Sequence, residues 1–185
     1  MVSSLNIVVQ FIFHLACMLF LIRFLLQASQ ADFYNPISQA VVKGTDPVCK
    51  PLRSIIKPMG GLDLASILVA WLVAVSSIYA LVYINQGGIA SPALTVLWLG
   101  LVKMLLVLTQ FYRYTLLIVI IASFLVQGSP HPALQLLQQL LEPLLAPIRR
   151  VMPNFGPIDL SPMLLILVIY LVENIISQMV PRGLG

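Results

Sequence analysis

Four long apolar segments alternate along the chain with two segments rich in proline and polar residues. The apolar segments cover about residues 5–27, 62–85, 93–127 and 161–180. Each is long enough to cross a bilayer, whose hydrocarbon core takes about 20 helical residues. Pro162 lies in the first turn of the last segment, and no proline lies further inside any of them. Because proline breaks the interior of a helix, this pattern predicts an all-α membrane protein with four main transmembrane helices.

The third apolar segment is too long for one simple crossing. As a single helix, residues 93–127 would extend about 52 Å, whereas the bilayer core is about 30 Å thick. We predict that about 105–127 form the membrane part and that 93–104 form an outer, interfacial or tilted extension. A fifth helix is the alternative, although residues 105–115 contain no turn signal.

Two connecting segments, 28–61 and 128–158, are rich in proline and carry most of the helix-breaking residues, and we expect both to be partly amphipathic. In the second segment, apolar residues at helical spacing form one face, which predicts an interfacial amphipathic helix or a helix docked against the bundle. Pro143 and Pro147 are expected to break or kink it. The residues of this apolar face are Leu134, Leu137, Leu141, Leu144, Ile148 and Val151.

One motif occurs twice, in residues 46–64 and 142–160. Each copy begins with an acidic residue and a proline, followed four residues later by proline, an aliphatic residue and arginine. Each ends with glycine, any residue, leucine or isoleucine, aspartate and leucine, just before an apolar segment. The duplication predicts two membrane modules, residues 1–88 and 89–185.

Composition supports a membrane protein. The chain of 185 residues is 60% hydrophobic and 9% charged, whereas about 25% of residues are charged in ordinary soluble domains. The net charge of +4 is small and lies mainly in the two connecting segments, which argues against nucleic-acid binding. The first apolar segment follows no basic residue and is too long for a signal peptide, so we expect a retained transmembrane helix.

Basic residues predict the orientation. They concentrate in the two connecting segments, so the positive-inside rule places both segments in the cytoplasm and both termini on the outer side of the membrane. The two modules then run in the same direction, as parallel repeats. The basic residues concerned are Lys43, Lys50, Arg53, Lys57, Arg149 and Arg150.

An arginine precedes an aspartate by ten residues in both copies of the motif. The pairs are Arg53 with Asp63 and Arg149 with Asp159. Each aspartate lies at the start of a membrane helix, where free N–H groups favour an anion. We therefore predict a duplicated structural clasp. The functional alternative is a basic surface, including Arg150, for anionic lipid headgroups or a protein partner.

Three polar residues fall inside the apolar segments at a similar predicted depth: His14, Arg113 and Glu173. An unpaired charge in the membrane is costly, so we predict an Arg113–Glu173 ion pair with His14 as a neighbour. A proton or cation route is the alternative. Arg23, near the inner end of its segment, is expected to snorkel to the headgroups.

Motifs for known catalytic chemistry are missing from the sequence. There is no phosphate-binding loop, HExxH, CxxC or nucleophile elbow. The two cysteines do not suggest a metal or redox site, and Cys49 is expected in a basic loop. We therefore expect no catalytic residues, no cofactor and no metal, and hence a protein that is not an enzyme.

The repeated motif, including Pro143–Arg150 and Gly156–Pro162, resembles the YggT (YlmG) family, in its two-copy proteobacterial form. The first copy departs from the pattern at Gly61, where the second has Pro157. The resemblance implies a small membrane protein of a largely uncharacterised family. Bacterial members are linked to osmotic or potassium homeostasis, and chloroplast relatives to cytochrome haem attachment and nucleoid organisation.

These observations favour a non-enzymatic membrane scaffold or assembly factor. Its expected partners are membrane lipids and either a protein partner or a second copy of itself, with no nucleic acid. The alternative is a transport-type role in ion or osmotic homeostasis, through the intramembrane polar residues.

Overall fold

The computed structural model describes residues 2–87, 92–125, 131–151 and 159–180. Within these residues the regular elements are six helices, and a single isolated bridge pairs Met59 with Leu62. The helices are α1 (Val2–Ala28), α2 (Pro36–Ile55), α3 (Leu64–Gln86), α4 (Ala93–Leu125), α5 (Pro132–Val151) and α6 (Ser161–Gln178). The predicted all-α class is confirmed for the described part of the chain.

Four of these helices, α1, α3, α4 and α6, are long and apolar enough to cross a membrane. The candidate spans are Ser4–Ala28, Leu64–Asn85, Ala93–Ser123 and Ser161–Gln178. The third is one continuous helix from residue 93, as expected for the segment 93–127, and no fifth helix interrupts its described part. Where the membrane part of this helix begins stays a prediction.

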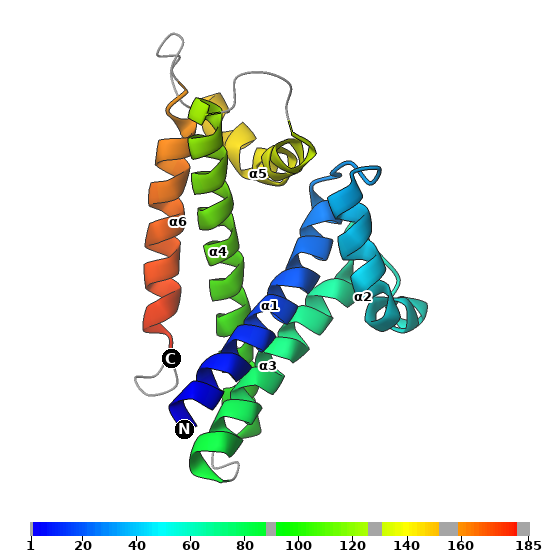
Figure 1. Cartoon of the computed structure of the whole chain (residues 1–185), viewed down its shortest axis with the longest axis vertical. Coiled ribbons are helices and arrows are strands. Elements are labelled where there is room, and N and C mark those ends of the chain that lie inside the picture. The colour runs from blue at the N-terminus through cyan, green and yellow to red at the C-terminus, as the bar shows by residue number, and fades with distance from the viewer. Residues whose placement is uncertain (1, 88–91, 126–130, 152–158, 181–185) are drawn as a thin grey trace.

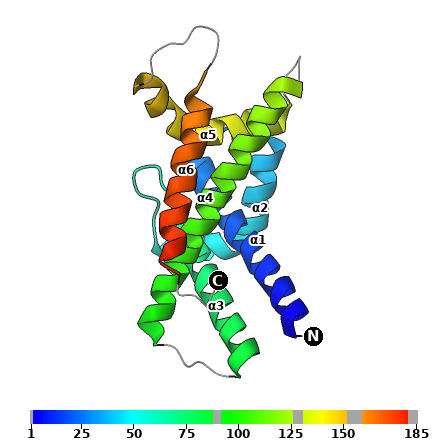
Figure 2. The same ribbon diagram turned by 90° about the vertical axis from the view of Figure 1, so that its left-hand side faces the viewer.

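The long helices form two antiparallel pairs (Figure 1). Helix α1 packs against α3, and α4 packs against α6, while α3 and α4 join the two pairs. Helices α1 and α4 run in the same direction, so the two repeats are parallel. The pairs lie closest at the lower end of Figure 1 and diverge toward the end where α2 and α5 lie. Figure 2 views the molecule from the side of α6 and shows α5 near the upper ends of α4 and α6.

Gly100 permits the closest approach between the repeats. A Cβ atom at this position would lie 2.3 Å from Cγ2 of Val75 and 3.2 Å from its Cα. Around this point α3 and α4 share a small apolar cluster that includes Val82, Val96 and Leu99. The absence of a side chain at residue 100 therefore lets the backbones of the two repeats pack directly.

Both connecting segments contain amphipathic helices, although each holds two internal prolines. Pro47 and Pro51 lie inside α2, and Pro143 and Pro147 lie inside α5. Amphipathic character was expected of both connections, and the first contains a helix of 20 residues in spite of its many breakers. In α2, Pro36 occupies the first turn, and the side chain of Asn35 accepts a hydrogen bond from the Ile37 N–H at 2.9 Å.

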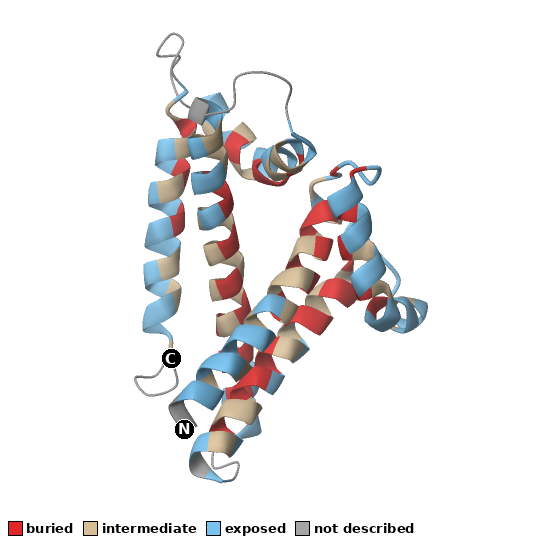
Figure 3. Ribbon diagram, in the orientation of Figure 1, coloured by how far each residue is buried: buried red, intermediate tan, exposed pale blue. Residues whose placement is uncertain are grey.

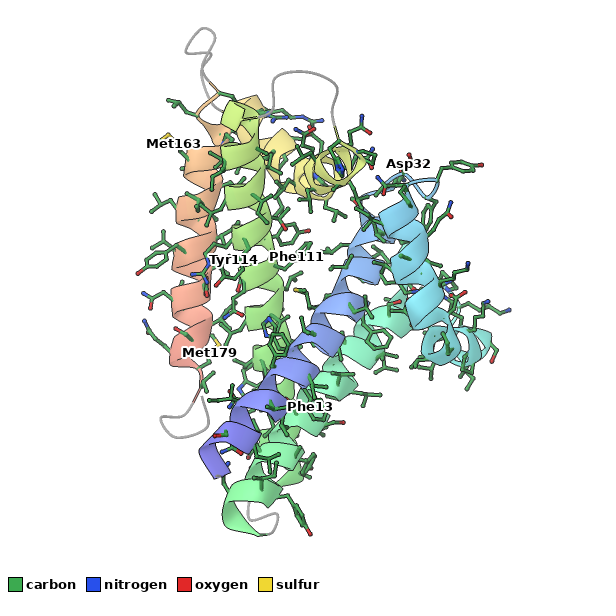
Figure 4. The ribbon with its side chains drawn as sticks, in the orientation of Figure 1. Phe13, Asp32, Phe111, Tyr114, Met163 and Met179 are labelled. Atoms are coloured by element: carbon green, nitrogen blue, oxygen red, sulfur yellow. The ribbon has the colours of Figure 1, made fainter. Side chains whose placement is uncertain are left out.

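Apolar contacts dock both amphipathic helices against the bundle. Leu136 and Leu140 of α5 pack with Leu25 and Leu26 of α1 and with Phe111 of α4. Figure 4 shows Phe111 on the side of α4 that faces α1 and α5. Of the two alternatives predicted for this segment, the structure has the helix docked against the bundle.

Burial follows the same arrangement (Figure 3). The buried residues lie along the sides of α1, α3 and α4 that face neighbouring helices, whereas much of α6 is exposed. The exposed side chains of α6 are mainly apolar, as expected of a helix that faces lipid. Leu167, for example, is 53% exposed.

Candidate functional site

The first Arg–Asp clasp joins the partly buried Arg53 to the buried Asp63 where α2 leads into α3. Arg53 Nε donates to Asp63 Oδ1 at 3.2 Å, and Arg53 Nη2 contacts Asp63 Oδ2. Asp63 is the N-cap of α3 and also accepts hydrogen bonds from the N–H and hydroxyl of Ser66. Its side chain is 1% exposed. This carboxylate therefore holds α2 against the start of a membrane helix.

Arg23 joins the same cluster, which corrects the expectation that it snorkels to the headgroups. Its side chain is 2% exposed, with Nε 3.3 Å from Asp63 Oδ2 and Nη2 2.8 Å from Asp46 Oδ1. Nη1 donates to Thr45 Oγ1 at 2.6 Å. Helix α2 supplies the carboxylate of Asp46, and the start of α3 supplies that of Asp63, so this guanidinium is paired inside the protein instead of reaching water.

The second clasp, Arg149 with Asp159, has the same local connection in a solvated setting. Arg149 Nε lies 3.0 Å from Asp159 Oδ2, and Nη1 lies 3.1 Å from Glu142 Oε2. The side chains of Arg149 and Asp159 are 43% and 47% exposed. Asp159 Oδ1 accepts a hydrogen bond from Ser161 N–H at 2.9 Å. Arg150, the other predicted contact residue, is exposed.

The surroundings of the two aspartates act on their pKa values in different ways. Burial raises the pKa of Asp63, but the hydrogen bonds from Arg53 and Ser66 and the charge of Arg53 outweigh it and lower the pKa overall. Hydrogen bonds from Ser161, with a smaller contribution from Arg149, lower the pKa of Asp159. Both carboxyl groups are therefore held in the charged form at neutral pH.

The two connecting segments touch each other, so α2 and α5 form one surface at this end of the bundle. Asp32 N–H donates to Gln139 Oε1 at 2.9 Å, and Asn35 Nδ2 donates to the Pro132 carbonyl at 2.8 Å. We call this surface, formed by the exposed sides of α2 and α5 and the residues that follow α2, the linker platform. It carries the exposed cations Lys43, Lys57 and Arg150.

Cys49 is buried under the linker platform, not exposed in a basic loop. Its relative exposure is 0%, and its Sγ lies 3.6 Å from the hydroxyl of Ser66. Residue 49 lies on the face of α2 that packs against α1 and α3. This thiol is consequently inaccessible to a surface cross-linker.

Within the membrane helices the structure brings Arg113 and Glu173 together but places His14 elsewhere. Arg113 Nη1 lies 3.2 Å from Glu173 Oε2, and the guanidinium stacks 5.0 Å from the centre of the Tyr114 ring. Figure 4 shows Tyr114 on the α6 side of α4, opposite Phe111. His14 instead lines a cavity with Lys103 on the α1 side of α4. Arg113 and Glu173 therefore join α4 to α6 without His14.

These clusters are suited to ion pairing and electrostatic recognition. In the described ranges, no three His, Cys, Asp or Glu side chains lie close enough to hold a metal ion. The buried cluster of Arg23, Asp46, Arg53 and Asp63 neutralises its own charges, whereas the cations on the linker platform face outward. The arrangement therefore offers binding through charge at one end of the molecule.

Sequence reasoning missed Arg23 and Asp46 as members of the first clasp. Asp46 is the first acidic residue of the repeated motif, and Glu142 has the same place in the second copy. That recurrence was the available signal, since Glu142 contacts Arg149 in the second clasp. No sequence signal linked Arg23 to these residues, because its counterpart 96 residues later is Val119.

Comparisons with known proteins agree with the duplicated arrangement. The model of the CCB3/YggT family matches twice, over residues 2–84 and 98–180. The chain is 39% identical to an uncharacterized protein encoded in the proC 3′ region of Vibrio alginolyticus, over 88% of each chain. It is 37% identical to the uncharacterized protein YggT of Escherichia coli K12, over 95% of this chain and 90% of the relative. No solved structure matches the chain.

Proposed function

Since this chain belongs to the CCB3/YggT family, we propose that it acts as a non-enzymatic scaffold or assembly factor of the bacterial inner membrane. Each of the two modules, residues 1–88 and 89–185, supplies one helix of the linker platform. Under the positive-inside rule the platform faces the cytoplasm and both termini face the periplasm. Its exposed cations would bind an acidic surface, of a protein partner or of the anionic lipids around it.

The observation that carries this proposal is that both helices of the linker platform, α2 and α5, are held in fixed positions. Each is tied to the following membrane helix by an Arg–Asp pair, and their apolar faces are packed against α1 and α4. A fixed surface presents its charges in one geometry, which reduces the entropy lost when a partner binds. Lys43, Lys57 and Arg150 are the exposed cations that such a partner would meet.

A role in ion or osmotic homeostasis through His14, Arg113 and Glu173 is not favoured. The relatives compared above have names that describe no transport activity. Arg113 and Glu173 are paired with each other, and His14 lies apart from them. A structural role, linking α4 to α6 through an ion pair, therefore explains the presence of Arg113 and Glu173.

Site-specific photo-cross-linking in intact membranes tests the scaffold proposal. A photoreactive amino acid at Lys43 or Arg150 of the full chain should give one dominant protein adduct, identified by mass spectrometry. The same group at Leu167, an exposed apolar residue of α6, is the control and should not give that adduct. An adduct with twice the mass of the chain would identify the partner as a second copy.

Charge variants separate electrostatic docking from simple proximity. With the cross-linker at Lys57, the double change Lys43→Glu and Arg150→Glu should abolish the adduct, because it reverses two platform charges. The change Lys43→Arg with Arg150→Lys keeps both charges and should retain it. An adduct that survives charge reversal, or that forms equally from Leu167, would contradict docking on the linker platform.

A further inference from the structure

A cavity of about 420 Å³ lies between the two repeats, in the half of the bundle where the chain begins. Its size falls within the range of about 300–1,000 Å³ that is usual for small-molecule sites. Helices α1, α3 and α4 supply its walls, and Val180, beyond the end of α6, completes the lining. Neither Arg–Asp clasp contributes to it.

The same face of two equivalent helices builds this cavity. The two clasps are 96 residues apart in the sequence, and that interval relates four lining residues of α1 to four lining residues of α4. The space is therefore a consequence of the duplicated fold. The equivalent positions are Ile7 and Lys103, Gln10 and Leu106, Phe11 and Val107, and His14 and Gln110.

The polar groups in the cavity break this symmetry. Lys103 brings a cation where the first repeat has Ile7, and Gln10 faces the space where the second repeat has Leu106. At the deeper end, His14 and Gln110 occupy equivalent positions. A cavity with a cation on one side only would hold an asymmetric ligand in one orientation.

Among the described residues, Lys103 lies in this cavity without an acidic side chain as a partner. All six acidic residues belong to the described ranges, and five of them form ion pairs with other bases. The sixth, Asp32, lies beside the linker platform at the other end of the bundle. A cation without a counter-ion is unfavourable in a membrane, so the site calls for an anion from outside the chain.

The position of the cavity matches the headgroup region. Ile7 is near the start of α1 and Val180 follows the end of α6, so this side of the cavity lies at the boundary of the candidate spans. Close by, Asn6 Nδ2 donates to Asn85 Oδ1 at 2.8 Å, as polar residues do near the membrane surface. Phe11 lines the cavity and is also 61% exposed, so the space opens toward the lipid phase.

We propose that this cavity binds one anionic phospholipid from the leaflet on the side of the termini. The phosphate would lie beside Lys103, and the N–H groups of Gln10, Gln110 and His14 would face the ester carbonyls below it. The acyl chains would leave along Phe11 into the bilayer. A zwitterionic lipid lacks the net charge that Lys103 requires, which makes the site selective for anionic headgroups.

Native mass spectrometry of the purified full chain tests this proposal. The chain is taken from nanodiscs that contain phosphatidylglycerol and phosphatidylethanolamine with identical acyl chains. We expect one retained phosphatidylglycerol, and Lys103→Gln should reduce its retention by about tenfold or more. Lys103→Arg should keep it, and Lys50→Gln, which alters an exposed linker cation, should leave it unchanged.

A second variant keeps the proposal testable if Lys103→Gln fails to fold. Gln10→Trp fills the cavity from an exposed position, keeps Lys103, and should also expel the lipid. Equal retention of the two lipids by the wild-type chain would overturn the proposal. So would retention that is unaffected by Gln10→Trp, or a loss in Lys50→Gln as large as that in Lys103→Gln.

Discussion

The two Arg–Asp clasps share one sequence motif but differ in their surroundings. Asp63 is 1% exposed and meets two arginines and a serine, whereas Asp159 is 47% exposed and meets Arg149 and the start of α6. At the position equivalent to Arg23 the second repeat has Val119, and Pro162 is equivalent to Ser66. The first clasp is thus part of a largely buried charge network, whereas the second is exposed.

This difference shows that the motif specifies which residues form the ion pair but not how much that pair contributes to stability. Removing one member of a buried ion network leaves other charges uncompensated in a medium that solvates them poorly. Water replaces the lost partner of an exposed pair at little cost. We therefore expect equivalent substitutions in the two repeats to have very different effects.

The largest effect is expected from Asp63→Ala. This change leaves Arg23 and Arg53 without their shared carboxylate and should lower the free energy of unfolding by about 3–5 kcal/mol. The matched control, Asp159→Ala, should lower it by only about 0–1 kcal/mol. Unfolding of the purified chain in mixed micelles, followed by circular dichroism, measures both. Similar losses in the two variants would show that burial does not distinguish the clasps.

A second test asks how much the close contact between the two repeats at Gly100 contributes to the stability of the fold. Gly100→Ala places a methyl group against Val75 and should destabilise the fold by about 1–3 kcal/mol. Val75→Ala in the same chain should restore part of the loss. Gly44→Ala is the control, because nothing lies within 4 Å of its added Cβ atom. That change should stabilise α2 by up to about 1 kcal/mol, and a loss there would contradict the packing explanation.

Acid should weaken the first clasp, and substitution of Asp63 should reduce this loss of stability. A carboxyl group whose pKa is lower in the folded state stabilises the protein fully above its unfolded pKa, about 3.9 for aspartate. That stabilisation is lost as the pH falls through the folded-state pKa. The free energy of unfolding of the wild-type chain should therefore decrease below about pH 4.

Comparison of two variants shows which aspartate causes this loss of stability in acid. Asp63→Asn should flatten the decrease, because its amide does not titrate in this range, whereas Asp159→Asn should leave most of it. Unfolding midpoints measured between about pH 7 and pH 3 provide the comparison. Identical curves for the wild-type chain and Asp63→Asn would place the sensitive group elsewhere.

The smallest effect is expected in the exposed pair of Glu142 and Arg149. A double-mutant cycle with alanine at both positions should give a coupling energy below about 1 kcal/mol. The coupling should weaken further at high salt, because both side chains are accessible to ions. A coupling that is large and independent of salt would mean that the second clasp is shielded as well as the first.

Several features were predictable because they depend on short distances along the chain. Arg53 and Asp63 are separated by one turn region, and the structure brings them together, as it does Arg149 and Asp159. The contact of Arg113 with Glu173 follows from a different constraint, since neither charge is stable alone among apolar helices.

Other features depend on packing between distant segments. Arg23 is 40 residues from Asp63, and the packing of α1 against the start of α3 makes their contact possible. The cavity beside Lys103 likewise requires α1 and α4 to lie on opposite sides of one space. The predicted membership of His14 in the Arg113 cluster relied on depth alone, which does not fix the direction in which a helix faces.

The sequence alone determined the membrane class, the duplication and the Arg–Asp clasp that joins each connecting segment to the next membrane helix. Long apolar runs need lipid or burial, and a pair spaced by ten residues is constrained by its own short segment. The tertiary structure alone decided which Arg–Asp clasp is buried and which cation has no acidic side chain beside it among the described residues. Those outcomes depend on which helix faces meet, and that is settled by the joint packing of α1 to α6.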